Sequence, residues 1–328
     1  MSKYAVIGSN SFSGASFVKH LCKDGHQVLG ISRSAELHPV FLGYAGQTNG
    51  KFSFQQFDLN HDLKLICSAL GDFRPDYIVN FAAQGMVAQS WDRPGDWFQT
   101  NTVATIKLHD ELRKFDWLKK YVHVSTPEVY GSCEGYVKED HPFSPSTPYA
   151  VSRAAADLSL ISFIKAYNFP VVFTRAANVF GEHQQLYRII PRTILYFMTS
   201  NKLQLHGGGT SVRSFIHIDD ICEGTERAAE CGETGEVFHF ATKQNISIRS
   251  LVELIALRLS VKFDDHVELV GERLGKDTAY LLDCSLSYNR LNWKPKISLD
   301  EGLVRTTQWV SENLNELLRQ PQDYIHKP

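Results

Sequence analysis

A tyrosine and an arginine four residues apart, Tyr149 and Arg153, have the side-chain types and spacing that best fit acid–base chemistry. This spacing places both side chains on one face of a predicted helix. A free phenol has a pKa of about 10 and is a weak base near neutral pH, but a fixed cation beside it favours the phenolate. The pair is therefore a candidate general base, and an ordinary pair of helix neighbours is the alternative.

A glycine-containing turn near the start of the chain has the composition of a dinucleotide-binding loop. Glycines let the backbone approach a pyrophosphate, which then rests on the N-terminus of the following helix. The middle glycine that is usual in such loops is Ser11 here. A plain strand-to-helix turn is the alternative. The cofactor contacts expected from this loop are Gly8, Asn10, Ser11, Phe12 and Gly14.

The end of the second predicted strand distinguishes between two nicotinamide cofactors. An acid here would bind the ribose 2′-hydroxyl of NAD, but residues 30–34 contain none. Ser32 and Arg33 instead suit a 2′-phosphate, which a guanidinium can grip with two hydrogen bonds. We therefore expect NADP ahead of NAD, and an Arg33 that is merely a surface residue is the alternative.

The elements that must position these residues alternate between strand and helix in the first half of the chain. Short apolar runs predict strands at residues 4–7, 27–31, 52–59, 77–81, 121–125 and 171–175. Helical spacing predicts intervening helices at residues 15–21, 63–70, 96–115 and 149–167. This alternation predicts an α/β fold, a Rossmann-type doubly wound parallel sheet with helices on both faces.

The second half of the chain is less regular and contains no long linker. A turn is expected at residues 206–210 between two short strands, and helices at residues 189–198, 248–259 and 299–318. We expect residues 1–178 to form the NAD(P)-binding domain, completed by segments near 212–241. Residues 179–328 would mainly form a smaller C-terminal α/β substrate-binding domain, with the site between the two.

Composition excludes several other classes of protein. The 328 residues carry a net charge of −2, which argues against a general nucleic-acid binder. No run approaches the roughly 20 apolar residues of a membrane helix, and the chain starts directly in a strand pattern, so a cytoplasmic protein is expected. The six scattered cysteines and the histidines show no metal spacing, so we expect free thiols and no metal.

Several ordered motifs together indicate a family. They are residues 80–84 (NFAAQ), 125–131 (STPEVYG), 149–153 (YAVSR), 175–181 (RAANVFG), 212–220 (VRSFIHIDD) and 271–277 (GERLGKD). With the glycine loop, they resemble the extended short-chain dehydrogenase/reductase family. The STPEVYG segment resembles the nucleotide-sugar 4,6-dehydratases in particular, and the similarity runs from Tyr4 to about Trp309.

This resemblance implies a reaction with a recycled, tightly bound nicotinamide cofactor. Hydride leaves sugar C4, water is eliminated across C5 and C6, and hydride returns to C6, which gives a 4-keto-6-deoxy sugar nucleotide. Besides the glycine loop and the second strand, the resemblance implies cofactor contacts from Asp58, Leu59, Ala82, Ala83, Asn101, Ser125, Tyr149 and Arg153.

The catalytic roles that the resemblance implies fall on four residues. Tyr149 would deprotonate the 4-hydroxyl, Thr126 would hydrogen-bond it, and Glu128 would take the C5 proton. Arg153 stands where the family has lysine, so electrostatic activation of the phenol survives but a proton relay through an amine does not. Pro127 replaces the aspartate of dTDP-glucose 4,6-dehydratases, as in GDP-mannose 4,6-dehydratases, which leaves Glu128 or water as the acid.

The resemblance also implies a nucleoside-diphosphate sugar as the partner and a homodimer built from helices 96–115 and 149–167. The substrate contacts expected are Gln84, Asn178, Arg188, Arg213 and Arg273. Sibling enzymes remain as alternatives: a 5,6-dehydratase, a decarboxylase or a C4 epimerase. A nucleotide-binding protein that has lost catalysis is a further alternative, because Ser11 and Arg153 depart from the family pattern.

Overall fold

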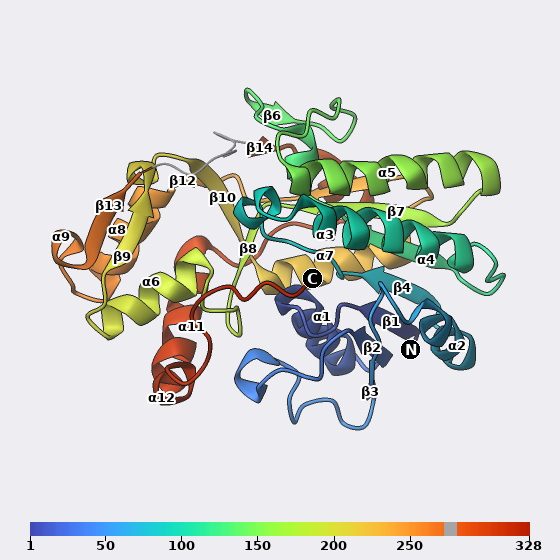
Figure 1. Cartoon of the computed structure of the whole chain (residues 1–328), viewed down its shortest axis with the longest axis horizontal. Helices are drawn as coiled ribbons and strands as arrows, with labels where there is room; N and C mark the ends of the chain where they lie inside the picture. Colours follow the sequence, from blue (N-terminus) through green and yellow to red (C-terminus); the bar gives the residue numbers. More distant parts are fainter. Residues whose placement is uncertain (272–280) are drawn as a thin grey trace.

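Seven parallel strands form the central sheet of the computed structural model, which describes residues 1–271 and 281–328 (Figure 1). In spatial order they are β11 (Val237–Phe240), β7 (Val171–Ala176), β5 (Lys120–Val124), β4 (Tyr77–Asn80), β1 (Lys3–Ile7), β2 (Gln27–Ser32) and β3 (Phe52–Gln56). The chain moves outward from β1 to β3 and then returns to β4 on the other side of β1. Ligands of such sheets bind at the carboxyl ends of the strands beside this switch point.

Helices cover both faces of the sheet, because successive strand residues point to opposite faces. Tyr4 and Val6 of β1 pack in one hydrophobic cluster with residues of α1 (Phe12–Lys23) and α7 (Ile218–Cys231). Ala5 and Ile7 pack in another cluster, with residues of α2 (Leu63–Phe73), α4 (Thr105–Leu112) and α5 (Pro148–Tyr167). The predicted Rossmann-type doubly wound sheet is confirmed.

A smaller unit lies beside the sheet, on the left in Figure 1, and has its own hydrophobic cluster. Its main elements are β8 (Asn178–Phe180), α6 (Ile189–Met198), β9 (Leu203–His206), β10 (Val212–His217), β12 (Asn245–Ser247), α8 (Ile248–Arg258), β13 (Val267–Val270) and α11 (Leu299–Glu312). A shorter helix, α9 (Phe263–His266), also belongs to it. The short strands β6 (Tyr136–Val137) and β14 (Leu281–Leu282) pair with each other and, with α10 (Ser285–Leu291), pack in the cluster of the large unit. Although α7 and β11 follow residue 212, β11 is a strand of the central sheet and α7 packs on one face of that sheet. The exact domain division stays a prediction.

Two helices that the sequence predicts as continuous are interrupted. Residues 96–115 form α3 (Pro94–Phe98), a π-helical segment η3 (Gln99–Ala104) and α4. The Thr105 hydroxyl donates to the Thr100 carbonyl oxygen at 2.9 Å, across this wider turn. Residues 299–318 form α11 and α12 (Leu314–Leu317), and the Asn313 side chain between them donates to the Trp309 carbonyl oxygen at 2.8 Å. In doing so it competes with the helical hydrogen-bond ladder.

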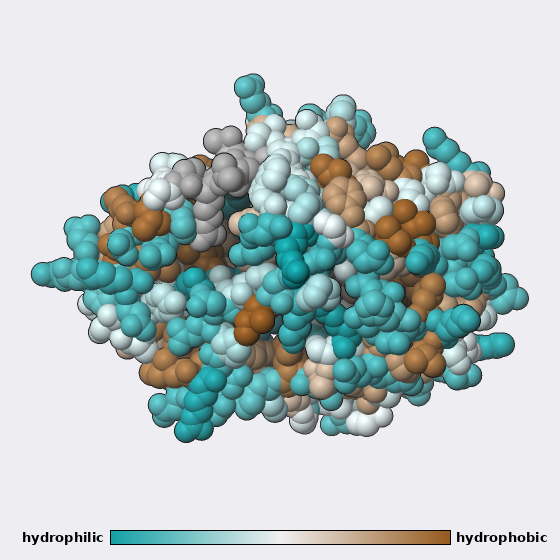
Figure 2. All heavy atoms as spheres, viewed as in Figure 1, coloured by the Kyte–Doolittle hydropathy of each residue, from teal (hydrophilic) through white to brown (hydrophobic). Residues whose placement is uncertain are grey.

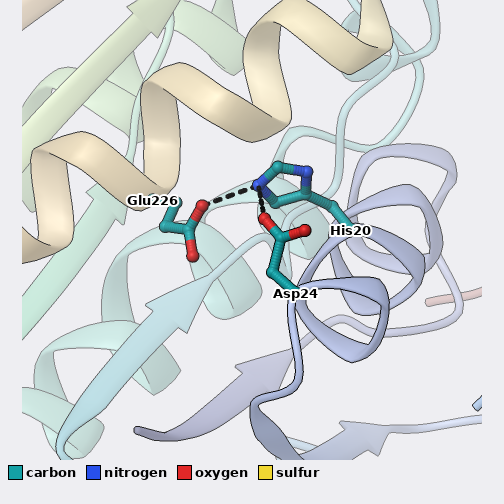
Figure 3. Close-up of side chains that lie close together, drawn as sticks. All are labelled: His20, Asp24 and Glu226. Atoms are coloured by element: carbon teal, nitrogen blue, oxygen red, sulfur yellow. Dashed lines mark hydrogen bonds and ion pairs between the residues drawn. The ribbon is translucent and has the colours of Figure 1, made fainter. Parts of the chain in front are cut away.

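The helices α1 and α7 are joined by a cluster of histidines and carboxylates (Figure 3). Glu226 lies 2.7 Å from His20 Nε2 and 3.1 Å from His26 Nε2, and Asp24 lies 3.7 Å from His20. Sequence spacing did not reveal this group, whose atoms are close enough to hold a cation. His26 Nδ1 accepts a hydrogen bond from the Ser2 backbone N–H, so its ring proton lies on Nε2 and points at Glu226. This arrangement is a hydrogen-bonded clamp between two helices, and the prediction of no metal stays a prediction.

No helix among the described residues is long and apolar enough to cross a membrane.

Candidate active site

The glycine loop between β1 and α1 is closed too tightly for side chains at two positions. A Cβ on Gly8, whose φ is +86°, would lie 2.6 Å from the Ala82 backbone nitrogen. A Cβ on Gly14 would lie 2.2 Å from the Gly8 carbonyl oxygen. The Ser11 hydroxyl caps α1 by accepting from the Gly14 N–H at 3.0 Å. The loop therefore presents bare backbone and a helix N-terminus at the switch point, which fits a pyrophosphate.

The residues expected beside the cofactor ribose make hydrogen bonds within the chain. Ser32 is 8% exposed, and its hydroxyl accepts from the Asn10 backbone N–H at 2.9 Å. The Asn10 amide nitrogen donates to the Ser34 and Ala35 carbonyl oxygens. Arg33 Nη1 donates to the Pro328 carbonyl oxygen at 2.8 Å. Both groups expected at a 2′-phosphate are thus engaged by other parts of the protein.

The remaining cofactor residues follow neighbouring strands of the sheet. Asp58, after β3, accepts from the Asn60 N–H at 2.8 Å, and the adjacent Leu59 is buried. Phe12 lies in the hydrophobic cluster under α1. Ala82 and the exposed Ala83 follow β4.

Asn101 and Gln84 are joined by two hydrogen bonds. Asn101 accepts from the Gln84 N–H at 2.8 Å and donates to the Gln84 carbonyl oxygen at 3.0 Å. It also donates to the Ser152 hydroxyl on α5 at 3.0 Å. Asn101 has no exposed surface, so it fixes the chain after β4 against α5. The π-helical segment around Asn101 sets where this amide points.

The catalytic loop and the start of α5 bring the expected reacting groups together. Thr126 caps the short helix η4 (Pro127–Tyr130) by accepting from the Glu128 N–H at 3.3 Å. Thr147 caps α5 in the same way, so Tyr149 lies in the first helical turn. The Thr126 side chain and the charges of Glu128, Arg153 and Arg188 all act on the ionisation of the Tyr149 phenol.

The ionisation of Tyr149 is governed by opposing neighbours. Burial raises the pKa of the Tyr149 phenol above its usual range, and the Glu128 carboxylate raises it further. Arg153, Thr126 and Arg188 lower that pKa but are outweighed. Arg153 thus acts in the direction expected from the sequence, but burial and Glu128 leave the free protein with a protonated phenol.

A buried ionic network lies behind the catalytic loop, and the sequence analysis missed its centre, Asp157. The Asp157 carboxylate accepts from the Ser125 hydroxyl and from Arg175 Nη2, each at 2.8 Å, and lies 3.3 Å from His123 Nε2. Burial alone would raise the pKa of Asp157, but Arg175 and His123 hold it well below its usual range. The available signal was spacing, because Asp157 follows Arg153 by four residues and faces the same side of α5.

Arg153 is anchored and almost fully buried. It is 3% exposed, and Nη2 donates to the Val124 carbonyl oxygen at the end of β5. Its buried Nε has no hydrogen-bond partner among residues 1–271 and 281–328. An unsatisfied donor beside Tyr149 fits a ribose hydroxyl of a bound cofactor.

The expected substrate residues lie on the small unit and its junction with the sheet. Asn178 on β8 pairs in register with Phe215 of β10, and Arg213 lies two residues before Phe215 on the same strand. Arg188 is exposed at the N-terminus of α6 and acts electrostatically on Tyr149. Arg273 falls outside the described residues.

Comparisons with known proteins agree with this architecture and with these motifs. The family described as GDP-mannose 4,6 dehydratase matches residues 6–306. A dTDP-glucose 4,6-dehydratase from Streptomyces antibioticus is 32% identical over 319 residues, which cover 94% of this chain and 92% of that protein.

Solved structures show the same fold. The dTDP-glucose 4,6-dehydratase DesIV from Streptomyces venezuelae, solved with NAD bound, has a TM-score of 0.87 and 28% identity, covering 96% of this chain and 98% of that one. The dTDP-glucose 4,6-dehydratase from Bacillus anthracis, in complex with NAD, has a TM-score of 0.87 and 27% identity over the same shares. The expected family is confirmed. The chain belongs to the GDP-mannose 4,6-dehydratase family, the nucleotide-sugar 4,6-dehydratases of the extended short-chain dehydrogenase/reductase type.

Proposed function

We propose that this chain converts a nucleoside-diphosphate sugar into its 4-keto-6-deoxy derivative by means of Thr126, Glu128, Tyr149 and Arg153. The observation that carries the proposal is that Thr126, Glu128 and Arg153 all act on the Tyr149 phenol, so that the four side chains converge at one place. A reductase or a simple epimerase uses a phenol and a hydroxyl such as those of Tyr149 and Thr126, but it has no role for a carboxylate beside the phenol.

Each of these side chains has one role in the proposal. The nicotinamide, when bound, accepts hydride from the sugar and later returns it. Tyr149 removes the proton of the 4-hydroxyl, and Thr126 hydrogen-bonds that oxygen. Glu128 removes the C5 proton, and since Pro127 cannot donate a proton, Glu128 or water protonates the leaving hydroxyl. Arg153 offers its unpaired Nε to the cofactor ribose and lowers the pKa of Tyr149.

We propose NAD as the resident cofactor, with NADP, the expectation from Ser32 and Arg33, as the competing candidate. The Ser32 hydroxyl already accepts from Asn10, and Arg33 already donates to Pro328. Both groups are thus already hydrogen-bonded within the chain and do not favour a 2′-phosphate. Both solved relatives described above contain NAD. Mass spectrometry of the nucleotide released by denaturing the purified protein distinguishes the two, because NADP carries one more phosphate.

The substrate contacts proposed are Gln84, Asn178, Arg188, Arg213 and Arg273. The cations among them would neutralise a diphosphate, and Arg188 also acts on Tyr149, which links the diphosphate side to the reacting side.

A homodimer through α3–η3–α4 and α5 is part of the proposal. Exposed apolar side chains gather on these elements: Phe98, Val103, Val151, Leu158 and Ile161. In Figure 2 apolar patches appear on the half of the molecule that holds α4 and α5. Exposed apolar side chains that gather on one part of a surface are typical of an interface. We expect sedimentation to show a monomer for Leu158→Glu and not for Leu257→Glu, the same change at a still more exposed leucine on α8 (76% against 56%).

The test of function is incubation with UDP-, dTDP-, GDP- and CDP-sugars, followed by mass spectrometry and NMR. Loss of one water with a 4-keto group and a C6 methyl group supports the proposal. Loss of carbon dioxide indicates a decarboxylase, and an isomer of unchanged mass indicates an epimerase.

Glu128→Gln separates the proposed steps. We expect dehydration to fall by about 10²–10⁴-fold, while reduction of bound cofactor by the substrate continues. Removal of the charge should also lower the pKa of Tyr149, which moves the pH profile of that reduction toward acid. Unchanged dehydration by Glu128→Gln would remove this residue from the mechanism.

A further inference from the structure

The segment after α12 crosses from the small unit to the large one in an extended conformation. In Figure 1 it is the dark red trace that leaves α12 and ends at the C mark, close to α1. Its residues alternate: Gln322, Tyr324 and His326 are half-buried, whereas Asp323, Ile325 and Lys327 are exposed. One side of the segment therefore packs against the protein and the other faces solvent.

The start of this segment is held by α6 and the turn before it. Arg192 Nη2 donates to the Gln322 carbonyl oxygen at 2.7 Å and pairs with the Asp323 carboxylate at 2.6 Å. The Tyr324 ring meets the Tyr187 ring edge-on, with centroids 5.4 Å apart. These contacts lie beside Arg188, a proposed substrate residue.

The end of the segment is held by the large unit. The His326 ring stacks on Trp97 of α3, with centroids 5.0 Å apart and planes 5° from parallel, and its Nε2 lies 2.7 Å from the Asp96 carboxylate. Gln84 Nε2 donates to the Lys327 carbonyl oxygen at 2.6 Å. Trp97 and Gln84 are both buried beneath it.

The last anchor is Arg33, which donates to the Pro328 carbonyl oxygen. Arg33 follows β2, and Gln84 follows β4, so the two anchors stand on opposite sides of β1 and its glycine loop. A dinucleotide with its pyrophosphate on that loop must run between them. The segment is therefore hydrogen-bonded to residues on both sides of the expected dinucleotide site.

We propose that residues 322–328 form a strap that closes over the bound dinucleotide and retains it, an inference that rests on the proposed function. In this proposal Arg33 holds the strap rather than a 2′-phosphate, and the Gln84 amide nitrogen holds the strap beside it. Retention suits a reaction that returns its hydride, because the cofactor leaves each cycle in the state in which it entered. The strap must open only for loading, and its exposed outer side leaves it free to lift.

The test measures how fast NADH leaves the intact protein. The protein is loaded with NADH, or with NADPH if that is the form it binds, and excess oxidised cofactor is added while the fluorescence of the reduced form is followed. His326→Ala removes the stack on Trp97 and the pair with Asp96. Ile325→Ala is the matched control, since this neighbour is 62% exposed. Deletion of residues 322–328 removes every anchor.

We expect dissociation to be faster by about tenfold or more for His326→Ala and for the deletion, and within twofold of the parent for Ile325→Ala. Hydrogen exchange gives a second measurement: the cofactor should slow exchange in residues 322–328 of the parent. Equal dissociation rates in all four proteins would overturn the strap while the proposed function stands. Slower dissociation after deletion would overturn it too, since the segment would then be an internal competitor. Failure of the parent and of all three variants to bind either cofactor would overturn both proposals.

Discussion

Asp157→Asn should destabilise the protein far more than the same change at an ion pair of equal length on the surface. Asp157 and Arg175 are 2.8 Å apart, with side chains 0% and 2% exposed. Asp110 and Arg113 are also 2.8 Å apart, but their side chains are 47% and 29% exposed. The two ion pairs thus have the same length and differ in burial.

The expected magnitudes follow from that difference. Removing one partner of a buried pair leaves an uncompensated charge and costs about 3–5 kcal/mol. At Asp157 the charge left behind is Arg175, and the buried Arg153 lies on the same helix face. Removing one partner of an exposed pair costs about 0–1 kcal/mol, because water and salt already screen it.

Urea unfolding of the two variants and the parent is the assay. With an m value of about 3 kcal/mol/M, Asp157→Asn should lower the midpoint by roughly 1 M or more, and Asp110→Asn by roughly 0.3 M at most. Equal shifts for the two variants would refute the reasoning, because burial would then have no bearing on what the ion pair contributes. A large shift for Asp110→Asn alone would refute it as well.

Two further predictions concern the helix clamp and the glycine loop. Burial lowers the pKa of His20, but the hydrogen bond to Glu226 and the charges of Glu226 and Asp24 together raise it. Burial raises the pKa of Glu226, but His20 and the other cations around it together lower it. The clamp should therefore stabilise the fold most between about pH 4.5 and 6.5. In urea unfolding, the stability that His20→Gln loses relative to the parent should shrink as pH rises through the raised pKa of His20. A loss that grows with pH would contradict this. In calorimetry, Gly8→Ala should weaken dinucleotide binding by about tenfold or more, because the new Cβ would collide with the Ala82 backbone. Gly46→Ala, which also has a positive φ but lies in open space, should bind the dinucleotide normally. Equal losses of affinity would show that backbone strain at positive φ, and not the collision, is responsible.

The sheet and the catalytic loop were predictable because their signals are local. A strand buried on both faces reads as a short apolar run, and the period of the following helix is visible in the same stretch of sequence. Tyr149 and Arg153 were predicted from the motif at residues 149–153 and their four-residue spacing, and Thr126 and Glu128 from the motif that follows β5.

The features that were missed depend on contacts between distant parts of the chain. Asp157 becomes central only when β7 brings Arg175 beside α5, and no local pattern contains that pairing. The π-helical turn at Asn101 preserves a helical hydrophobic pattern, so the sequence still reads as one helix. The segment 322–328 has neither a helical nor a strand-like hydrophobic pattern. Only the folded structure shows which residues its polar groups contact.

The anchors of the strap also impose an order of events during biosynthesis. The hydrogen bond from Arg33 to Pro328 spans 295 residues, and the one from Gln84 to Lys327 spans 243. Contacts of such sequence separation must await synthesis of everything between them, whereas the glycine loop and its first neighbours emerge from the ribosome early. The nascent chain therefore passes through a stage in which the loop is complete and still uncovered, and at that stage a nucleotide from solution can enter without any part of the finished protein having to open.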